Sequence, residues 1–338
     1  MAPQVLFWLG RIKHIQKQDD EGRSYFETLV KQYPLSFYST IAFDLAKIPS
    51  PTSWASSFSS PNYLRESLKI KSPRTPEFNI DPILAPLALR AQILIKAQLG
   101  PWAQGAVADL HAAVRRHAEL KAKPELYVTI SRLYYAVGDF NQAISLTTQI
   151  AQAIPGFWAI YPEQLLVYFP QPFRDLYQHA STEYDVDLNW LLAISRQESG
   201  FRADVTSGAN AHGLMQLIVP TAQRFATPGY QDNKDWPSRL LNPETNVKIA
   251  ANYLNYLGRY YQKQESLVFG AYNAGEFVVD SWVKQRPHPD LLTWIELIPF
   301  GETKGYVRNV WRNFSVYRYI GFENEPLARN PEQSLLPF

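Results

Sequence analysis

Cysteine is absent from this sequence of 338 residues. The absence excludes disulfide bonds, thiolate metal sites and a cysteine nucleophile, although it does not decide the cellular compartment. Stability must therefore come from a hydrophobic core, and 46% of the residues are hydrophobic. A chain of this length and composition is expected to fold into two domains.

Strong net charge and long apolar runs are missing as well. The 33 Lys and Arg residues nearly balance the 31 Asp and Glu residues, so no nucleic-acid partner is predicted. No segment reaches the roughly 18 consecutive apolar residues of a membrane-spanning helix. The apolar stretch 5–9 is too short for the core of a signal peptide, and no basic residue precedes it. We therefore expect a chain whose export signal has been removed or never existed.

The usual signatures of metal and cofactor sites are also missing. The six histidines show no metal-ligand spacing with acidic residues. Asp185-Val-Asp187 is better explained as a helix cap than as part of a calcium loop, because the other ligand positions are unfilled. A Gly-rich phosphate loop and a Gly-x-Ser-x-Gly nucleophile elbow do not occur. We predict neither a metal nor a cofactor.

Helical periodicity dominates what is present. Helix pairs are expected at 87–100 with 101–114 and at 126–138 with 140–150. The segment 135–143 resembles the turn of a tetratricopeptide-type helix pair. The predicted fold is mainly α, with a superhelix of such pairs in the N-terminal half.

Prolines mark the expected connections between these parts. They concentrate first between residues 48 and 86, which predicts a loop-rich connection, and again between 154 and 172, where we place the domain boundary. The predicted division is a superhelical region at 1–160, a mostly helical domain at 161–325 and a tail at 326–338. Asn242 followed by Pro243 is a strong helix start within the second domain, and a short hairpin is expected within 203–213.

The stretch 188–200 predicts a helix that carries a carboxylate on its apolar side. Glu198 follows Ile194 and Leu191 at intervals of four and seven residues, so it shares their stripe. Apolar surroundings disfavour the charged form of a carboxyl group and raise its pKa, as a general acid requires. Asp187 is a suitable N-cap for this helix.

A structural role for Glu198 remains open on spacing alone. Arg196 and Arg202 lie close in sequence, and an ion pair between one of them and Glu198 would explain a glutamate at a helix end.

Three compact clusters after Glu198 combine small residues with neutral hydrogen-bonding side chains. Small residues let backbone approach a ligand, while amide and hydroxyl groups suit a carbohydrate with its hydroxyl and acetamido groups. The clusters are Gly213-Leu-Met-Gln216, Ala271-Tyr-Asn-Ala-Gly275 and the run from Ile298-Pro-Phe to Tyr306-Val-Arg-Asn-Val310.

Together with Arg196-Gln-Glu-Ser199, these clusters make residues 169 to about 321 resemble the catalytic domain of the soluble lytic transglycosylase family. The last run is characteristic of its large Slt-type members. The resemblance implies a lysozyme-like, mostly helical catalytic domain preceded by a helical superhelix. It also implies peptidoglycan glycan strands as the substrate and the periplasm or cell envelope of a bacterium as the location.

The resemblance assigns roles by position. Glu198 matches the catalytic acid of the family. The residues implied to line the sugar-binding cleft are Ser207, Gly213, Met215, Gln216, Tyr272, Asn273, Glu296 and Tyr306. The chain departs from the family pattern at His212, where a small residue is usual, and at Leu217-Ile218, which replaces an Ile-Met pair. These changes put the packing of the loop and one sugar contact in doubt.

Counting carboxylates predicts the mechanism. Glycosidases with two carboxylates place an acid and a nucleophile or base on either side of the scissile bond. Here the motifs offer one clear acid, so the substrate must supply the nucleophile, and the expected product has a 1,6-anhydromuramyl end. The reaction is then that of a carbon–oxygen lyase acting on a polysaccharide. Two alternatives are a lysozyme-like hydrolase that gives reducing ends and a helical scaffold that only binds glycan.

Overall fold

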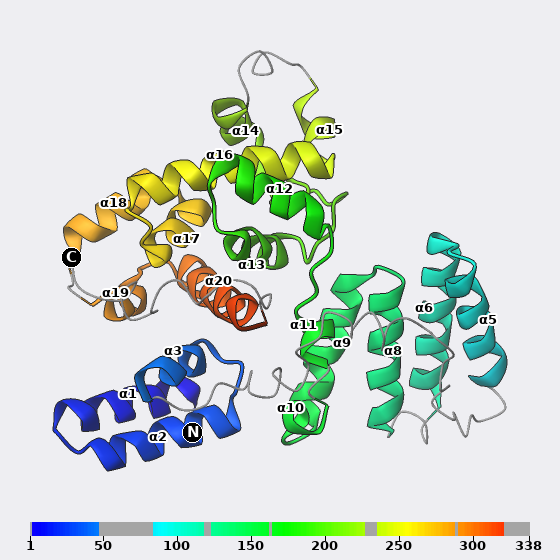
Figure 1. Ribbon diagram of the computed structural model, residues 1–338, viewed down its shortest axis with the longest axis horizontal. Coiled ribbons are helices and arrows are strands. Elements are labelled where there is room, and N and C mark those ends of the chain that lie inside the picture. Colours follow the sequence, from blue (N-terminus) through cyan, green and yellow to red (C-terminus); the bar gives the residue numbers. More distant parts are fainter. Residues whose placement is uncertain are drawn as a thin grey trace. The chain divides into compact units, whose positions relative to one another are not determined.

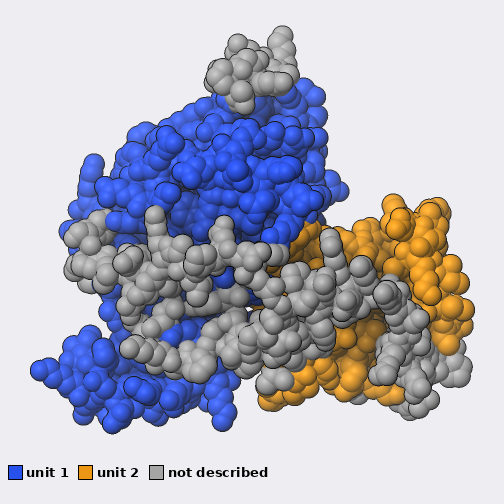
Figure 2. Space-filling model, viewed as in Figure 1, with its two compact units in different colours: residues 1–52, 173–338 blue, residues 53–172 orange. Residues whose placement is uncertain are grey.

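The computed structural model describes residues 2–46, 84–117, 123–161, 164–226, 235–287 and 290–320. The chain forms two compact units, one made of residues 1–52 and 173–338 and the other of residues 53–172 (Figure 2). The described parts are helical except for one small hairpin, so the predicted mainly α class is confirmed. None of the helices in these described segments is both long and apolar enough to cross a bilayer.

Within the second unit, the described residues from 84 onwards form the row of helix pairs that the sequence predicts. The helices are α5 (Leu84–Lys96), α6 (Gly100–Arg116), α8 (Pro124–Ala136), α9 (Phe140–Ala153), α10 (Phe157–Ile160) and α11 (Gln164–Tyr168). Each of α5, α6, α8 and α9 packs against the next, and Figure 1 shows them standing side by side. Their facing stripes bury Leu110, Ile130 and Leu146, as expected for a stacked helical repeat.

The other unit begins with three helices, α1 (Pro3–Ile15), α2 (Asp19–Gln32) and α3 (Phe37–Ala46). The helices α1 and α2 approach closely at Gly10 and Gly22. A Cβ on Gly10 would lie 2.6 Å from the Phe26 ring, and one on Gly22 would lie 2.9 Å from the Gly10 carbonyl oxygen. Glycine is therefore needed at both positions for this spacing of the two helices.

The remainder of this unit, as far as it is described, is a bundle of helices. Its elements are α12 (Arg174–Tyr184), α13 (Leu188–Glu198), α14 (Val219–Phe225), α15 (Trp236–Leu240), α16 (Pro243–Tyr260), α17 (Glu265–Ala274), α18 (Glu276–Gln285), α19 (Leu291–Leu297) and α20 (Gly301–Ile320). The helix α13 packs on α12 and α20, and α17 packs on α16, α18 and α20. Figure 1 shows α13, α17 and α20 meeting at the centre of this bundle.

Local signals in the sequence start several of these helices. Asn242 accepts a hydrogen bond from the Thr245 amide at 3.0 Å, as predicted for the cap of α16. Asp187 caps α13 by accepting from the Asn189 amide at 2.8 Å. These caps confirm both predicted helix starts.

The hairpin extends further along the chain than the predicted range. Strand β1 (Ala211–His212) pairs with β2 (Leu217–Ile218), and a single bridge joins Thr206 to His212. The ladder therefore extends beyond the expected range of 203–213, because the Gly213–Gln216 loop forms the turn that brings residue 217 back onto residue 212.

The two compact units do not coincide with the domains predicted from the sequence, which divide at residue 160. Residues 1–52 join residues 173–338 because α3 packs on α20, a contact between segments far apart in sequence. The unit boundary near residues 172 and 173 lies at the end of the second proline cluster. The division into functional domains stays a prediction, and the tail at 326–338 and most of the connection at 48–86 lie outside the described residues.

Candidate active site

Glu198 is the last residue of α13, and its side chain is only partly exposed. The preceding residues of its stripe, Leu191 and Ile194, are fully buried. The helix ends there because Gly200 adopts a left-handed φ of 58°, which directs the chain away from the helix axis. The carboxylate is thus presented at a helix end with apolar residues behind it.

Burial raises the pKa of Glu198 to about 7, while the hydrogen bond from Tyr306 acts in the lowering direction. The Tyr306 hydroxyl donates a hydrogen bond of 2.6 Å to Oε1 of Glu198. The two nearby arginines are bonded elsewhere, Arg196 to the Asn313 side chain at 3.1 Å and Arg202 to the Ser199 carbonyl at 3.1 Å. Glu198 therefore has the environment of a proton donor at neutral pH and not that of an ion-paired surface residue.

A network of hydroxyl groups fixes the position of α13. The hydroxyls of Tyr177 and Ser195 lie 2.6 Å apart, and Ser195 and Ser199 both donate to the carbonyl of Leu214, at 3.2 Å and 2.8 Å. Tyr177, Ser195 and Ser199 are all buried. The network ties the helix of Glu198 to the loop 213–216 that lies beside it.

The Gly213–Gln216 loop depends on backbone conformations that ordinary residues avoid. Gly213 has φ 75°, and a Cβ there would lie 2.2 Å from the Leu240 carbonyl oxygen. Gln216 has φ 47° and donates through Nε2 to the carbonyls of Gly213 at 2.9 Å and Val205 at 3.2 Å. The glycine permits close approach of two backbone segments, and the glutamine side chain holds the loop in its shape.

Asn246 of α16 fastens this loop from the other side. Its Oδ1 accepts the Met215 amide at 2.8 Å, and its Nδ2 donates to the carbonyls of His212 at 2.8 Å and Leu240 at 2.9 Å. Asn246 is fully buried, and all these polar groups are satisfied.

Tyr272 connects the loop to α17. Its hydroxyl donates to the Met215 carbonyl at 2.8 Å, and the nearby Glu198 charge adds to burial in raising the pKa of Tyr272. Asn273 follows it in the last turn of α17 and is exposed. Glu198, Tyr306, Tyr272 and the Met215 region are thus brought together.

Two predicted site residues have their main contacts elsewhere. Ser207 accepts the Ala211 amide at 3.1 Å and so stabilises the turn before β1. Glu296 accepts from the Tyr38 hydroxyl at 2.6 Å and from Gln4 at 3.0 Å, and it forms an ion pair with Arg308. The cleft roles of Ser207 and Glu296 remain predictions.

The sequence interpretation missed Asn246, Tyr177 and Ser195. Asn246 had a visible signal, because it lies four residues before Ala250 on the apolar stripe of α16, where a polar residue needs a buried partner. Ser195 had the same kind of signal, since it lies four residues after Leu191 on the apolar stripe of α13. Tyr177 gave no signal, because its contact joins two helices whose packing angle is not readable from periodicity.

Within the described segments, no three His, Cys, Asp or Glu side chains are grouped so as to hold a metal ion. The chemistry available at the site is proton transfer by Glu198, hydrogen bonding by Tyr306 and contacts from a rigid loop.

A partly buried glutamate at a helix end, faced by a glycine-containing loop in a small helical bundle, is the arrangement expected of a lysozyme-like domain. Residues 175–295 match the family described as the transglycosylase SLT domain. The soluble lytic murein transglycosylase of Escherichia coli K12 is 36% identical over 157 residues, which are 45% of this chain and 24% of that protein. The Salmonella typhimurium LT2 protein of the same name is 34% identical over 169 residues, 48% of this chain and 26% of that protein.

The fold extends the likeness beyond the SLT domain. The crystal structure of the 70 kDa soluble lytic transglycosylase from Escherichia coli superimposes with a TM-score of 0.69 at 25% identity, over 94% of this chain and 46% of that chain. The chain is thus similar to soluble lytic transglycosylases of the Slt type, with the SLT domain match confined to residues 175–295. It matches about a quarter of the length of these curated relatives and less than half of the solved structure.

Proposed function

We propose that this chain is a lytic transglycosylase that cleaves peptidoglycan at the β-1,4 bond between N-acetylmuramic acid and N-acetylglucosamine. The observation that carries the proposal is a single carboxyl group, Glu198, whose pKa is raised to about 7 by burial. Its pKa responds to burial and to Tyr306 and to no second carboxylate. The names of the two bacterial relatives and the match of residues 175–295 to the transglycosylase SLT domain support the same substrate.

The reaction needs one group that gives and then takes a proton. Glu198 donates its proton to the glycosidic oxygen as the bond from that oxygen to the muramyl C1 breaks. The muramyl 6-hydroxyl then attacks C1, and its proton passes to the Glu198 carboxylate. Glu198 ends protonated as it began, no water is consumed, and the product carries a 1,6-anhydro ring.

The neighbours of Glu198 have distinct tasks in this scheme. Tyr306 orients the carboxyl group and stabilises its charged form after the first proton transfer. Tyr272 and Gln216 hold the Met215 loop against which the acetamido group of the sugar would lie. An attack within the substrate gains from proximity, with effective molarities up to about 10⁵–10⁸ M for well-oriented groups. With this proposed substrate, the protein would act in the periplasm or cell envelope of a bacterium.

Digestion of purified peptidoglycan followed by mass spectrometry of the muropeptides tests the proposal. The wild-type protein should release anhydromuropeptides, which are one water lighter than the products of hydrolysis. The Glu198→Gln variant should still bind glycan and release none. Glu183→Gln is the matched control, because Glu183 is exposed and pairs with Lys248 on the surface at 3.5 Å.

The same experiment separates two other functions. Products with reducing ends, one water heavier, would identify a lysozyme-like hydrolase that uses Glu198 with an external water. Binding without any product from the wild type would identify a glycan-binding scaffold. Either result would overturn the transglycosylase assignment.

A further inference from the structure

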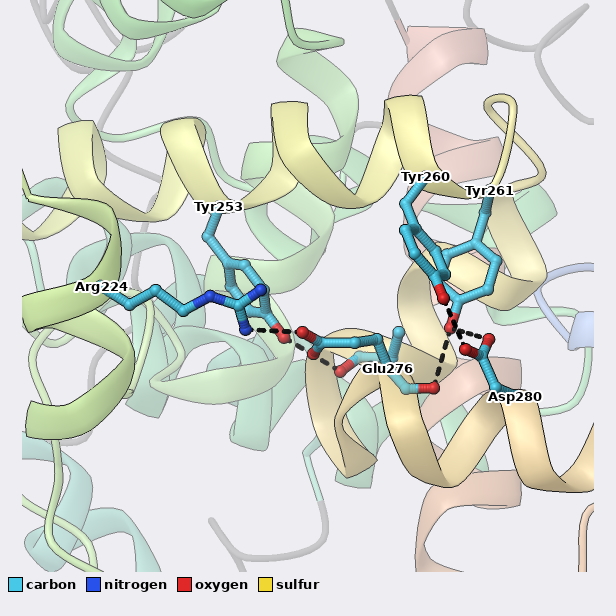
Figure 3. Close-up of polar contacts among 7 residues, drawn as sticks. Arg224, Tyr253, Tyr260, Tyr261, Glu276 and Asp280 are labelled. Atoms are coloured by element: carbon cyan, nitrogen blue, oxygen red, sulfur yellow. Dashed lines mark hydrogen bonds and ion pairs between the residues drawn. The ribbon is translucent and has the colours of Figure 1, made fainter.

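An ion pair outside the predicted site joins the two sides of that site. Arg224 of α14 donates through Nη1 to Oε1 of Glu276, the first residue of α18, at 2.6 Å (Figure 3). The Glu276 side chain is 7% exposed, whereas that of Arg224 is 49% exposed. A carboxylate this deeply buried requires its partner, because an unpaired buried charge is strongly destabilising.

The pair connects the two chain segments that carry site residues. Arg224 lies eight residues after Gln216, in the helix that directly follows β2. Glu276 follows the Tyr272-Asn273 turn, separated from it by Ala274 and by Gly275 with φ 87°. The ion pair therefore ties the loop segment to the tyrosine segment a second time, in addition to the bond from Tyr272 to the Met215 carbonyl.

Aromatic rings fill the space between the ion pair and Tyr272. The Tyr253 ring lies 5.4 Å from the Tyr272 ring and 4.7 Å from the Phe225 ring. The Arg224 guanidinium lies over Phe225 at 4.8 Å and over Tyr256 at 4.9 Å. A displacement of Arg224 would therefore be transmitted through packed rings to Tyr272.

The first half of α18 is also anchored at the C-terminal end of α16. Tyr261 donates to the Glu276 carbonyl at 3.1 Å and shares Asp280 with Tyr260, at 3.0 Å and 2.6 Å (Figure 3). With α18 held on α16, the Arg224–Glu276 contact sets where the first turn of α18 lies relative to α14. Glycine at 275 lets this turn follow directly on α17.

Resting on the proposed function, we propose that Arg224 and Glu276 are positioning residues of the active site, which set the distance between Tyr272 and the Met215–Gln216 loop beside Glu198. Neither side chain touches the reacting atoms. Buried pairs of this kind contribute little net stability, so a role in fixing geometry accounts for the cost of burying Glu276.

The variant Glu276→Gln tests this role, because it keeps the shape of the side chain and leaves the half-exposed Arg224 in contact with water. It should lower kcat on peptidoglycan by about 10- to 100-fold, the cost of a small misplacement of catalytic groups, with KM unchanged. Arg224→Lys keeps the charge but loses the planar stack, so its kcat should fall between those of wild type and Glu276→Gln. Asp109→Asn is the matched control, since it removes the carboxylate of an exposed pair with Arg90 in the other unit and should leave kcat unchanged.

A second measurement reports on the site without substrate. The groups that face Glu198 are Tyr306 and Tyr272. If the Tyr272 side loosens in Glu276→Gln, water reaches the carboxyl group and its pKa moves below the wild-type value of about 7. Nuclear magnetic resonance titration of the carboxyl group measures this shift even if the wild type proves inactive, which separates this inference from the proposed function.

Two results would overturn the positioning role. The first is a Glu276→Gln or Arg224→Lys variant with a lower melting temperature but with wild-type kcat and an unshifted Glu198 pKa, which would show that the pair serves stability alone. The second is a kcat of the Arg224→Lys variant that is as low as that of Glu276→Gln, together with an equal loss of kcat in the control variant Asp109→Asn.

Discussion

Two carboxylates in this molecule, Glu198 and Glu296, are contacted by the same helix and have opposite surroundings. Tyr306 of α20 bonds to Glu198, and Arg308, two residues further along, pairs with Glu296. Glu198 has a phenol and apolar packing around it, and its pKa rises to about 7. Glu296 has a guanidinium beside it, together with the hydroxyl of Tyr38.

The difference shows how one helix, α20, can contact both an acid on α13 and an anchor on α19. Burial without a counter-ion favours the protonated carboxyl group, which can give a proton away. A carboxylate beside a guanidinium and a phenol accepts charge-assisted hydrogen bonds, which can hold two elements together. Glu296 joins α19 to α20 and to the N-terminal helices α1 and α3, so its contacts are those of a structural anchor.

The largest expected effect is the difference in peptidoglycan cleavage when Glu198 or Glu296 is replaced by glutamine. Glu198→Gln should reduce peptidoglycan cleavage by about 10²–10⁴-fold, the contribution of a general acid, because glutamine cannot donate the proton. Glu296→Gln should retain most of the activity and lose stability, by about 1–3 kcal/mol for a charge-assisted contact. Release of anhydromuropeptides and urea denaturation measure the two effects. Equal losses of cleavage in both variants would show that both carboxylates act in the chemistry.

The next largest effect is the dependence of the free energy of unfolding on pH. Glu198 has a pKa of about 7 in the folded protein against an ordinary value of 4.5, so the folded state binds the proton more tightly. Its contribution to stability is therefore present below pH 4.5 and is lost as the pH rises to 7, by about 3 kcal/mol at most. Glu198→Gln should consequently unfold at a higher temperature than wild type at pH 8 and at a similar temperature at pH 4. Calorimetry at the two pH values checks this, and a stabilisation that does not change with pH would contradict it.

The smallest effect is expected when the phenol that contacts each carboxylate is removed. Tyr306 and Tyr38 each donate a hydrogen bond of 2.6 Å, to Glu198 and Glu296 respectively. Tyr306→Phe removes the contact that lowers the pKa of Glu198, so the alkaline limb of the pH–rate profile should move above its wild-type position. Tyr38→Phe should leave the limb in place and cost about 1 kcal/mol of stability. Movement of the limb in Tyr38→Phe would show that the Glu296 contact is coupled to Glu198.

Periodicity and caps in the sequence were sufficient for much of the fold. The helix pairs of residues 84–153, the cap at Asn242 and the stripe of Leu191, Ile194 and Glu198 all depend on neighbours within one or two turns. Local spacing therefore predicted them.

Contacts between distant segments were beyond the reach of the sequence. The packing of α3 on α20 groups residues 1–52 with the SLT domain, and nothing in either segment announces the other. The bond from Tyr306 to Glu198 spans 108 residues. Family resemblance placed Tyr306 in the site, but only the folded chain shows that it is the residue that holds the acid.

The proposed reaction requires that Glu198 keep a proton near neutral pH. A pH titration of the protein labelled with ¹³C at the glutamate carboxyl groups tests it most directly, with the Glu198→Gln variant identifying the signal. We expect a midpoint near 7 in the wild type. A midpoint near the ordinary value of 4.5, in a protein that still releases anhydromuropeptides, would show that the acid is protonated by some means other than burial.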